Sequence, residues 1–144
     1  MNADFNEKTI LLVEDNAGDE ALTLRALNRA SIRNNVVVAR DGAEAIDYLF
    51  GAQKGALPVI VLLDLKLPKI NGHEVLARIR SESRTKLLPV VMLTSSSEQE
   101  DVTNAYTGGV NSYIQKPVDF TRFAEVVKNL GLYWLVINVP PPQS

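Results

Sequence analysis

The segment VIVLLDLKLP, residues 59–68, limits what this chain can fold into more than any other segment. Five successive apolar residues lead directly to Asp64, and Pro68 follows four residues later. A continuous apolar run bounded by a turn signal is typical of a strand that is buried on both faces, as in a parallel sheet. Here the predicted strand ends in a carboxylate, Asp64. A buried charge without a partner costs free energy. We therefore expect Asp64 to have a partner or a chemical use.

Apolar runs and helical patterns alternate along the rest of the chain. Strands are predicted at 9–15, 35–40, 59–64, 88–94 and 110–116, and helices at 18–30, 41–50, 72–83, 97–108 and from about residue 119. Leu22 and Ala26, with Arg29 or Ala30, lie at helical spacing on the first helix. A serine after Thr94 is expected to cap the fourth helix. Five strands, each followed by a helix, predict an α/β fold with a doubly wound, five-stranded parallel sheet.

Composition excludes several classes of protein. The 144 residues suffice for one domain with a real core, and the formal net charge of -2 gives no electrostatic case for nucleic acid or an anionic membrane. There is no cysteine, so a disulfide framework and a thiolate metal site are excluded. The N-terminus lacks the pattern of a signal peptide, and no apolar stretch is long enough to span a membrane. We expect a soluble cytoplasmic protein without a nucleic-acid or membrane partner.

Polar residues follow the predicted strands at their carboxyl ends. Glu14 and Asp15 follow the first strand, Asp64 the third, Thr94 the fourth and Lys116 the fifth. In open parallel sheets the functional site lies outside these ends, where the strand order reverses. Three carboxylates, one hydroxyl and one ammonium are therefore expected to converge at one edge of the sheet.

This set of groups suits phosphoryl transfer. Neighbouring carboxylates repel each other unless a cation joins them, and oxygen ligands without His or Cys suit Mg²⁺, or Mn²⁺ in its place. The metal and Lys116 can neutralise phosphoryl oxygens, and Thr94 supplies a hydroxyl donor. Asp64 can then attack phosphorus in line, which gives an aspartyl-phosphate. Asp64 is best explained as a phosphoryl acceptor.

At residues 9–130 the chain resembles the receiver domains of two-component response regulators. The residues that match the family's motifs are Glu14, Asp15, Asp64, Pro68, Asn71, Gly72, Thr94, Tyr113, Lys116 and Pro117. The resemblance implies a flavodoxin-like receiver fold with strand order 2-1-3-4-5, and a cis peptide bond between Lys116 and Pro117. It implies that Asp15, Asp64 and the main-chain carbonyl of Lys66 hold Mg²⁺, while Glu14 acts through water.

The same resemblance assigns the remaining roles. Thr94 and Lys116 would contact the phosphoryl oxygens on Asp64, and Thr94 with Tyr113 would form the switch. The protein would catalyse only its own phosphorylation and dephosphorylation, with a histidine kinase as its phosphoryl donor. It would not be an enzyme acting on other substrates.

The flanking segments suggest a narrower group. EDNAGD, FGAQKGALP and YWLVINVPPP resemble stand-alone regulators that serve phytochrome-type histidine kinases. We divide the chain into an N-terminal tail (1–8), the receiver domain (9–130) and an apolar, proline-rich C-terminal extension (131–144). From residue 130 to residue 139 only Gly131 and Asn138 are not apolar, which is more than one domain can bury. We therefore expect a homodimer through the fourth and fifth helices and the extension.

Other functions were weighed against this one. A magnesium-dependent phosphatase needs a second acid two residues after its nucleophile, where this chain has Lys66. A flavin-binding module needs a hydroxyl- and glycine-rich loop after the first strand, where EDNAGDE would repel a phosphate. A phosphorylation-independent, receiver-like binding module is the remaining alternative. Tyr113 as an inert packing residue and His73 as a surface residue are the plain interpretations of those two positions.

Overall fold

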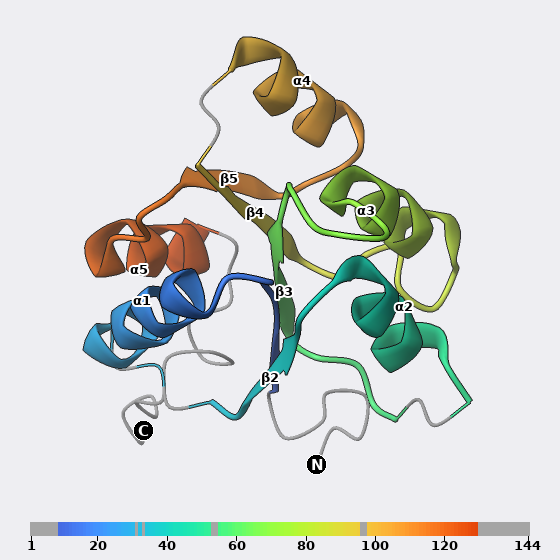
Figure 1. The fold of residues 1–144 in the computed structure, drawn as a ribbon, viewed down its shortest axis with the longest axis horizontal. Helices are drawn as coiled ribbons and strands as arrows, with labels where there is room; N and C mark the ends of the chain where they lie inside the picture. Colours follow the sequence, from blue (N-terminus) through green and yellow to red (C-terminus); the bar gives the residue numbers. More distant parts are fainter. Residues whose placement is uncertain (1–8, 31, 33, 53–54, 96–97, 130–144) are drawn as a thin grey trace, which may run out of the picture.

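The computed structural model describes residues 9–30, 32, 34–52, 55–95 and 98–129, and this part of the chain forms an alternating series of strands and helices (Figure 1). The elements are β1 (Ile10–Val13), α1 (Ala17–Arg29), β2 (Val36–Ala39), α2 (Gly42–Phe50), β3 (Ile60–Asp64), α3 (Gly72–Ser81), β4 (Val90–Thr94), α4 (Gln99–Thr107), β5 (Ser112–Gln115) and α5 (Phe120–Asn129). Each element overlaps the segment for which it was predicted. The N-terminal tail and the C-terminal extension lie outside the described residues.

The five strands form one parallel sheet in the order β2-β1-β3-β4-β5. Ile10 of β1 is in register with Val36 of β2 on one side and Ile60 of β3 on the other. The chain therefore reverses its winding between β2 and β3, and the carboxyl ends of β1 and β3 mark the switch point. The predicted fold class and strand order are confirmed.

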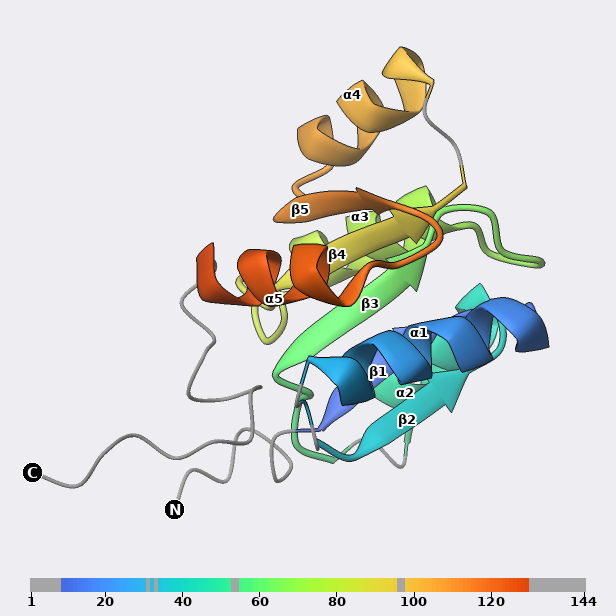
Figure 2. The same ribbon diagram turned by 90° about the vertical axis from the view of Figure 1, so that its left-hand side faces the viewer.

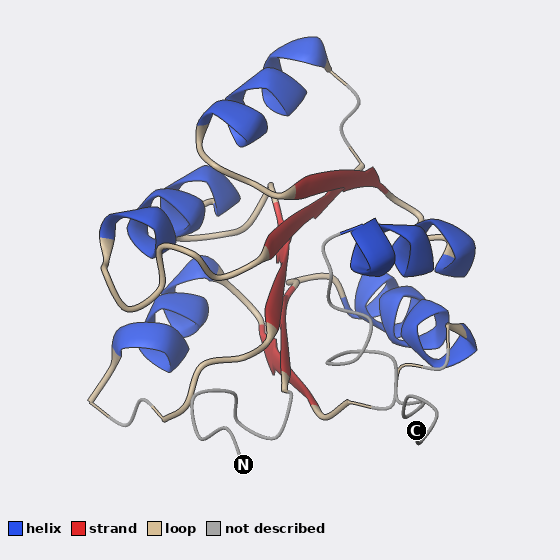
Figure 3. Ribbon diagram, turned by 180° about the vertical axis from the view of Figure 1, so that it is seen from behind, coloured by secondary structure: helices blue, strands red, loops and turns tan. Residues whose placement is uncertain are grey.

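Helices cover both faces of the sheet. Figures 1 and 2 show α1 and α5 side by side on one face, and Figure 3 shows the strands enclosed between this pair and the pair α2 and α3. Alternate strand residues point to opposite faces, which divides the core into two clusters. Leu63 and Met92 pack with α2 and α3, together with Ala105 of α4. Leu62 and Leu93 pack on the other face with Phe123 of α5. Burial of β3 from both sides explains its continuous apolar run.

Side-chain caps fix where three helices begin. Asn16 accepts a hydrogen bond from the main chain of α1, Asp41 does so for α2, and Asn71 forms a complete capping box with Glu74 at the start of α3. Three helix starts therefore lie next to the carboxyl ends of β1, β2 and β3, which positions the loops of the switch point.

The expectation that a serine caps α4 is wrong for the part of the chain that the structure describes. The N-cap of α4 is Glu98, and its side chain makes no capping hydrogen bond. The helix begins at Gln99, and its N-cap position holds an acid and not a serine. Glu100 and Asp101 in its first turn interact favourably with the helix dipole instead.

The buried face of α1 also differs from the predicted one. Thr23, Ala26 and Leu27 are buried, whereas Leu22 is 46% exposed. The predicted stripe is therefore right for Ala26 and wrong for Leu22, whose place on the buried face is taken by Thr23. The true stripe continues toward the N-terminus to Asp19, which lies four residues before Thr23 and so on the same face.

Candidate functional site

Three carboxylates meet at the carboxyl ends of β1 and β3. Glu14 and Asp15 directly follow β1, and Asp64 is the last residue of β3. One carboxylate oxygen of each lies within 4.8 Å of the others. Glu14 and Asp64 are buried, and Asp15 is exposed to solvent. The structure thus brings together the acids that were expected at this edge of the sheet.

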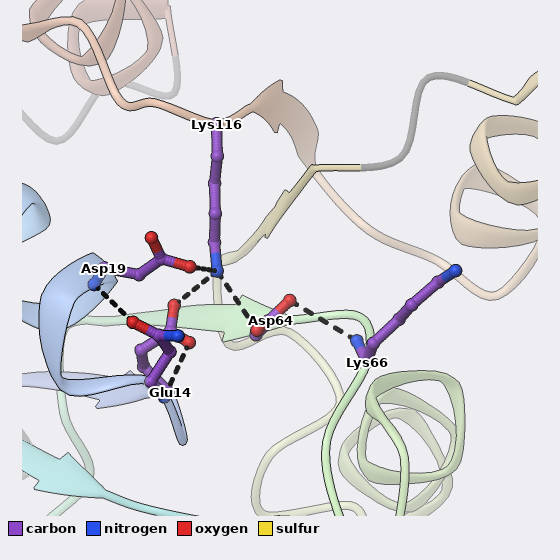
Figure 4. A network of polar contacts seen from close by, with 6 residues as sticks. Glu14, Asp19, Asp64, Lys66 and Lys116 are labelled. Carbon is purple, nitrogen blue, oxygen red and sulfur yellow. Dashed lines mark hydrogen bonds and ion pairs between the residues drawn. The ribbon is translucent and has the colours of Figure 1, made fainter.

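Lys116 reaches these acids from the end of β5 (Figure 4). Its Nζ lies 2.6 Å from Oε1 of Glu14, 3.1 Å from Oδ2 of Asp64 and 3.0 Å from Oδ2 of Asp19. Its side chain is only 10% exposed. The peptide bond between Lys116 and Pro117 is cis, as the family resemblance implied.

Asp19 is the site residue that the sequence analysis missed. Its backbone N–H donates to Oδ1 of Asn16 in the cap of α1, and its side chain extends to Lys116. An acid in the first turn of a helix is ordinarily explained by the helix dipole alone. The available signal was the spacing of Asp19, Thr23 and Ala26, which places the acid on the inward face of α1.

Burial and ion pairing set the charges in the site. Burial raises the pKa of Glu14 to about 7, which the close contact with Lys116 only partly offsets, and the nearby Asp64 charge raises it further. Burial alone would lower the pKa of Lys116, but its contacts with Glu14, Asp19 and Asp64 outweigh burial and raise it. Lys116 is therefore charged throughout the physiological pH range.

The loop between β3 and α3 folds tightly beside Asp64. The backbone N–H of Lys66 donates to Oδ1 of Asp64 at 3.3 Å, and the N–H of Gly72 donates to the carbonyl of Leu65 at 2.8 Å. A Cβ on Gly72 would lie 2.4 Å from the Asp64 carbonyl oxygen, so only glycine allows this approach. Both carboxylate oxygens of Asp64 are thus held, Oδ1 by Lys66 and Oδ2 by Lys116.

Thr94 and Tyr113 lie on neighbouring strands beyond Asp64. Thr94 is the buried last residue of β4, and its carbonyl accepts a hydrogen bond from the N–H of Lys116 at 2.7 Å. Tyr113 is half-buried in β5 and packs against the core cluster of α2 and α3. Met92, its register partner, lies in the same cluster, so strand alternation places Thr94 on that face as well.

The donor set fits a hard divalent cation. Glu14, Asp15 and Asp64 cluster together, and Asp19 shares the Lys116 ammonium with Glu14 and Asp64. The carboxylates outnumber the ammonium, and carboxylate oxygens are the ligands that such a cation prefers. A cavity of about 510 Å³ adjoins the acids; it is lined by Asp15, Leu65, Lys66, Leu67, Pro68, Asn71, His73 and Asp101. His73 is half-buried rather than fully on the surface.

The sequence of residues 10–128 matches the family model of the response regulator receiver domain. The chain belongs to the response regulator receiver family. The resemblance seen in the sequence is confirmed. Receiver domains are signalling modules that bind a divalent metal and work with histidine kinases, so the acidic cluster lies where such a metal is expected.

Among proteins of known sequence, this receiver is similar to the probable methanogenesis regulatory protein FilR2 of Methanothrix harundinacea (strain 6Ac). The two are 43% identical over 134 residues, which is 92% of this chain and 86% of the relative. It is also similar to the response regulator Rcp1 of Synechocystis sp. (strain ATCC 27184 / PCC 6803 / Kazusa). Those two are 37% identical over 133 residues, 89% of each chain.

Solved structures of response regulators are also similar to this chain. The bacteriophytochrome response regulator RtBRR superposes with a TM-score of 0.80 at 51% identity, covering 94% of this receiver and 84% of that chain. The Mn²⁺-bound form of Rcp1 superposes with a TM-score of 0.70 at 36% identity, and the phosphorylated cyanobacterial phytochrome response regulator RcpA with 0.73 at 39% identity. In both cases the match covers 94% of this receiver and 99% of the other chain. In the described part of the chain, no helix has the length and apolar character needed to cross a membrane.

Proposed function

We propose that this protein is a receiver, with its domain at residues 9–130, that accepts a phosphoryl group on Asp64 from the phosphohistidine of a partner kinase. The observation that carries the proposal is the arrangement around Asp64. Lys116 lies 3.1 Å from Oδ2, the Lys66 N–H holds Oδ1, and Glu14 and Asp15 lie beside it. This arrangement orients one carboxylate and supplies the charge that a phosphoryl group needs.

The transfer is a direct substitution at phosphorus. A carboxylate oxygen of Asp64 forms a bond to phosphorus while the bond from phosphorus to the kinase imidazole nitrogen breaks. The imidazole leaves with that electron pair, so no oxidant or further reactant is needed. Lys116 stabilises the negative charge on the phosphoryl oxygens, and the Thr94 hydroxyl donates a hydrogen bond to them. Hydrolysis of the aspartyl-phosphate by water in the same site would end the signal, so the protein would catalyse only its own phosphorylation and dephosphorylation.

The acids of the site supply the metal ligands. Asp15, Asp64 and the main-chain carbonyl of Lys66 would hold Mg²⁺, or Mn²⁺ in its place, with Glu14 acting through water. A bound divalent cation offsets the charge on phosphoryl oxygens as they approach the acids. The excess of carboxylates over ammonium groups in the site supports this assignment.

A phytochrome-type histidine kinase is the partner that the comparisons support. The solved structures that resemble this chain include a bacteriophytochrome regulator and a phosphorylated phytochrome regulator, each matched over 94% of this chain. We expect phosphotransfer from a phytochrome-type kinase to outpace transfer from an unrelated histidine kinase when both are compared at equal concentration. Both partners would meet in the cytoplasm.

Asp64→Asn tests the proposed acceptor because it removes the nucleophile and keeps the shape of the side chain. With acetyl phosphate or a phosphorylated kinase and Mg²⁺, the wild type should become labelled and Asp64→Asn should not. Asp47→Asn is the matched control, since Asp47 is an exposed acid on α2. Undiminished labelling of Asp64→Asn would place the acceptor elsewhere. A wild type that no donor can label would favour a phosphorylation-independent binding module.

Phosphorylation would be transmitted through Thr94 and Tyr113. Thr94 would move toward the phosphoryl group, and Tyr113 would turn into the space that this movement opens. Their position on one face of the sheet and the partial burial of Tyr113 support this role. Structures with and without beryllofluoride should differ in the Tyr113 rotamer, and identical rotamers and Thr94 positions would contradict the switch.

We further propose a homodimer through α4, α5 and the C-terminal extension. The apolar run after residue 129 supports it, as does Tyr106 on α4, which is 50% exposed. Light scattering at micromolar concentration should show a dimer for the full chain. A chain that ends at residue 129 should be a monomer or insoluble, and a strictly monomeric full chain, phosphorylated or not, would contradict the interface.

A further inference from the structure

Three carboxylates surround the Lys116 ammonium: Asp19 and Asp64 accept hydrogen bonds from it, and Glu14 forms a close ion pair with it. An ammonium group has three donors and no more, and Glu14, Asp19 and Asp64 each place one oxygen within 3.1 Å of Nζ. Three negatively charged oxygens thus already lie against the ammonium. A phosphoryl oxygen that binds Lys116 must compete with them for space and for N–H donors.

The three partners differ in what their release would cost. Glu14 is completely buried, and a buried carboxylate that loses its cation is strongly destabilised. Asp64 is 8% exposed and is itself the group to which the phosphoryl is attached. Asp19 is 39% exposed, so water can replace Lys116 around its carboxylate at small cost. Asp19 is the partner that is easiest to replace.

The position of Asp19 is set by the packing of α1. Thr23, Ala26 and Leu27 bury the inward face of the helix, and Asp19 continues that face one turn toward the N-terminus. The cap hydrogen bond at this end uses the backbone N–H of Asp19 and leaves its side chain available for Lys116. The packing of the helix therefore places Asp19 on the face next to the ammonium.

We propose that Asp19 is a positioning residue that competes with the phosphoryl group for Lys116. It accepts a hydrogen bond from the ammonium while Asp64 is unmodified, and it adds one negative charge to the region that an anionic donor must enter. When a phosphoryl group arrives on Asp64, Lys116 exchanges Asp19 for a phosphoryl oxygen. Asp19 thus lowers the affinity of the site for phosphoryl groups and limits phosphorylation by small anionic donors. The inference rests on the proposed function of Asp64.

Asp19→Asn removes the charge and leaves the backbone cap of α1 intact. Glu20→Gln is the matched control, because it removes the neighbouring acid of the same helical turn, whose partner is Arg40 and not Lys116. Asp19→Glu retains the charge and tests rescue. Beryllofluoride binding, followed by fluorine NMR at saturating Mg²⁺, measures affinity for a phosphoryl-like group without any chemical step. The Mg²⁺ affinity of each variant is measured separately so that saturation is ensured.

Beryllofluoride should bind Asp19→Asn about two- to fivefold more tightly than the wild type, as expected for loss of one partly exposed ion pair. Glu20→Gln should match the wild type, and Asp19→Glu should return toward it. In metal-free protein, the Lys116 ammonium protons should exchange with water faster in Asp19→Asn than in Glu20→Gln, a signature that altered helix stability alone would not give.

The outcomes separate this inference from the function on which it rests. Equal or weaker beryllofluoride binding by Asp19→Asn, with normal binding by the wild type, would overturn the competition and leave Asp64 as the acceptor. An equal gain in Glu20→Gln would likewise overturn it, because the effect would then come from helix charge in general. A wild type that binds no beryllofluoride in the presence of Mg²⁺ would refute the proposed function itself.

Discussion

The Nζ of Lys116 lies 2.6 Å from Oε1 of Glu14, and the Glu14 side chain is completely buried. Water cannot reach this carboxylate to stabilise its charge, so its ionisation depends on Lys116 and on any bound cation. The other oxygen of Glu14 accepts a hydrogen bond from the Asn16 N–H at 3.2 Å. Ionisation of Glu14 is consequently linked to metal binding, and this link can be measured.

The affinity for Mn²⁺ or Mg²⁺ should depend on pH through Glu14. Burial raises the pKa of Glu14 to about 7, and a cation favours the deprotonated form. Below about pH 7 the proton must be displaced, so the apparent Kd should rise by up to about tenfold for each pH unit. Above that pH the affinity should be level. Electron paramagnetic resonance of free Mn²⁺ measures this directly.

Glu14→Gln is the control for this pH dependence. It should bind Mn²⁺ more weakly at about pH 8 and should lose most of the change in affinity between about pH 7 and pH 6. If the wild type keeps a constant affinity across that range, the group that titrates at about pH 7 is not linked to the metal.

Lys116→Met should destabilise the metal-free protein by about 1–3 kcal/mol, because it leaves the Glu14 and Asp64 carboxylates without a cation. The loss should be smaller at about pH 6, where Glu14 is largely protonated. Urea unfolding with and without Mg²⁺ measures this change in the free energy of unfolding. Mg²⁺ should stabilise the variant more than the wild type. Lys86→Met is the control, because it replaces an exposed lysine outside the site. It should change the free energy of unfolding by less than about 0.5 kcal/mol.

Gly42→Ala should displace the loop that carries Lys66. A Cβ on Gly42 would lie 1.8 Å from the carbonyl oxygen of Ile70, so the start of α2 and the β3–α3 loop could not keep their contact. We expect a loss of about 1–3 kcal/mol in the free energy of unfolding and weaker Mn²⁺ binding. Gly55→Ala is the matched control, because its Cβ would meet no atom within 4 Å. Full Mn²⁺ affinity in Gly42→Ala would show that this contact does not position the loop.

Arg80 should contribute to the free energy of unfolding and not to metal binding at the site. Its guanidinium donates to the carbonyls of Gly109, Lys86 and Leu88 and to Oδ1 of Asn111, which ties α3 to the loops before β4 and β5. Arg80→Ala removes this donor from the partly buried carbonyls of Gly109 and Leu88 and should lower the free energy of unfolding by about 2–4 kcal/mol, measured by thermal or urea unfolding. At a temperature where the variant is folded, its Mn²⁺ affinity should equal that of the wild type.

Arg78→Ala is the control on the same helix. Arg78 pairs with exposed Glu82 at 3.0 Å and lies 4.4 Å above the ring of Phe50, so its removal should cost less than about 1 kcal/mol. Equal losses for the two arginines would mean that the network around Arg80 is not the source of its contribution.

Several features of the molecule follow from the sequence alone. The unbroken apolar run before Asp64 predicts a strand buried from both sides, because a parallel sheet covered by helices offers no polar face. The order of strands and helices then places Glu14, Asp15, Asp64, Thr94 and Lys116 at one edge, since parallel strands end together. These inferences need only local pattern and connectivity, and the sequence contains both.

Other features were decided by packing between segments that are distant in the chain. The rotation of α1 is fixed by Thr23, Ala26 and Leu27 against the sheet, and it turns Asp19 toward Lys116, 97 residues away. Apolar spacing had favoured Leu22 for the buried face, because a short amphipathic pattern defines the face of a helix only to within about one residue. The contact of Gly42 with Ile70 likewise depends on how α2 lies against a loop that forms later in the sequence. Local sequence determines which elements form, whereas the distances between their side chains are determined by the tertiary packing that brings remote elements into contact.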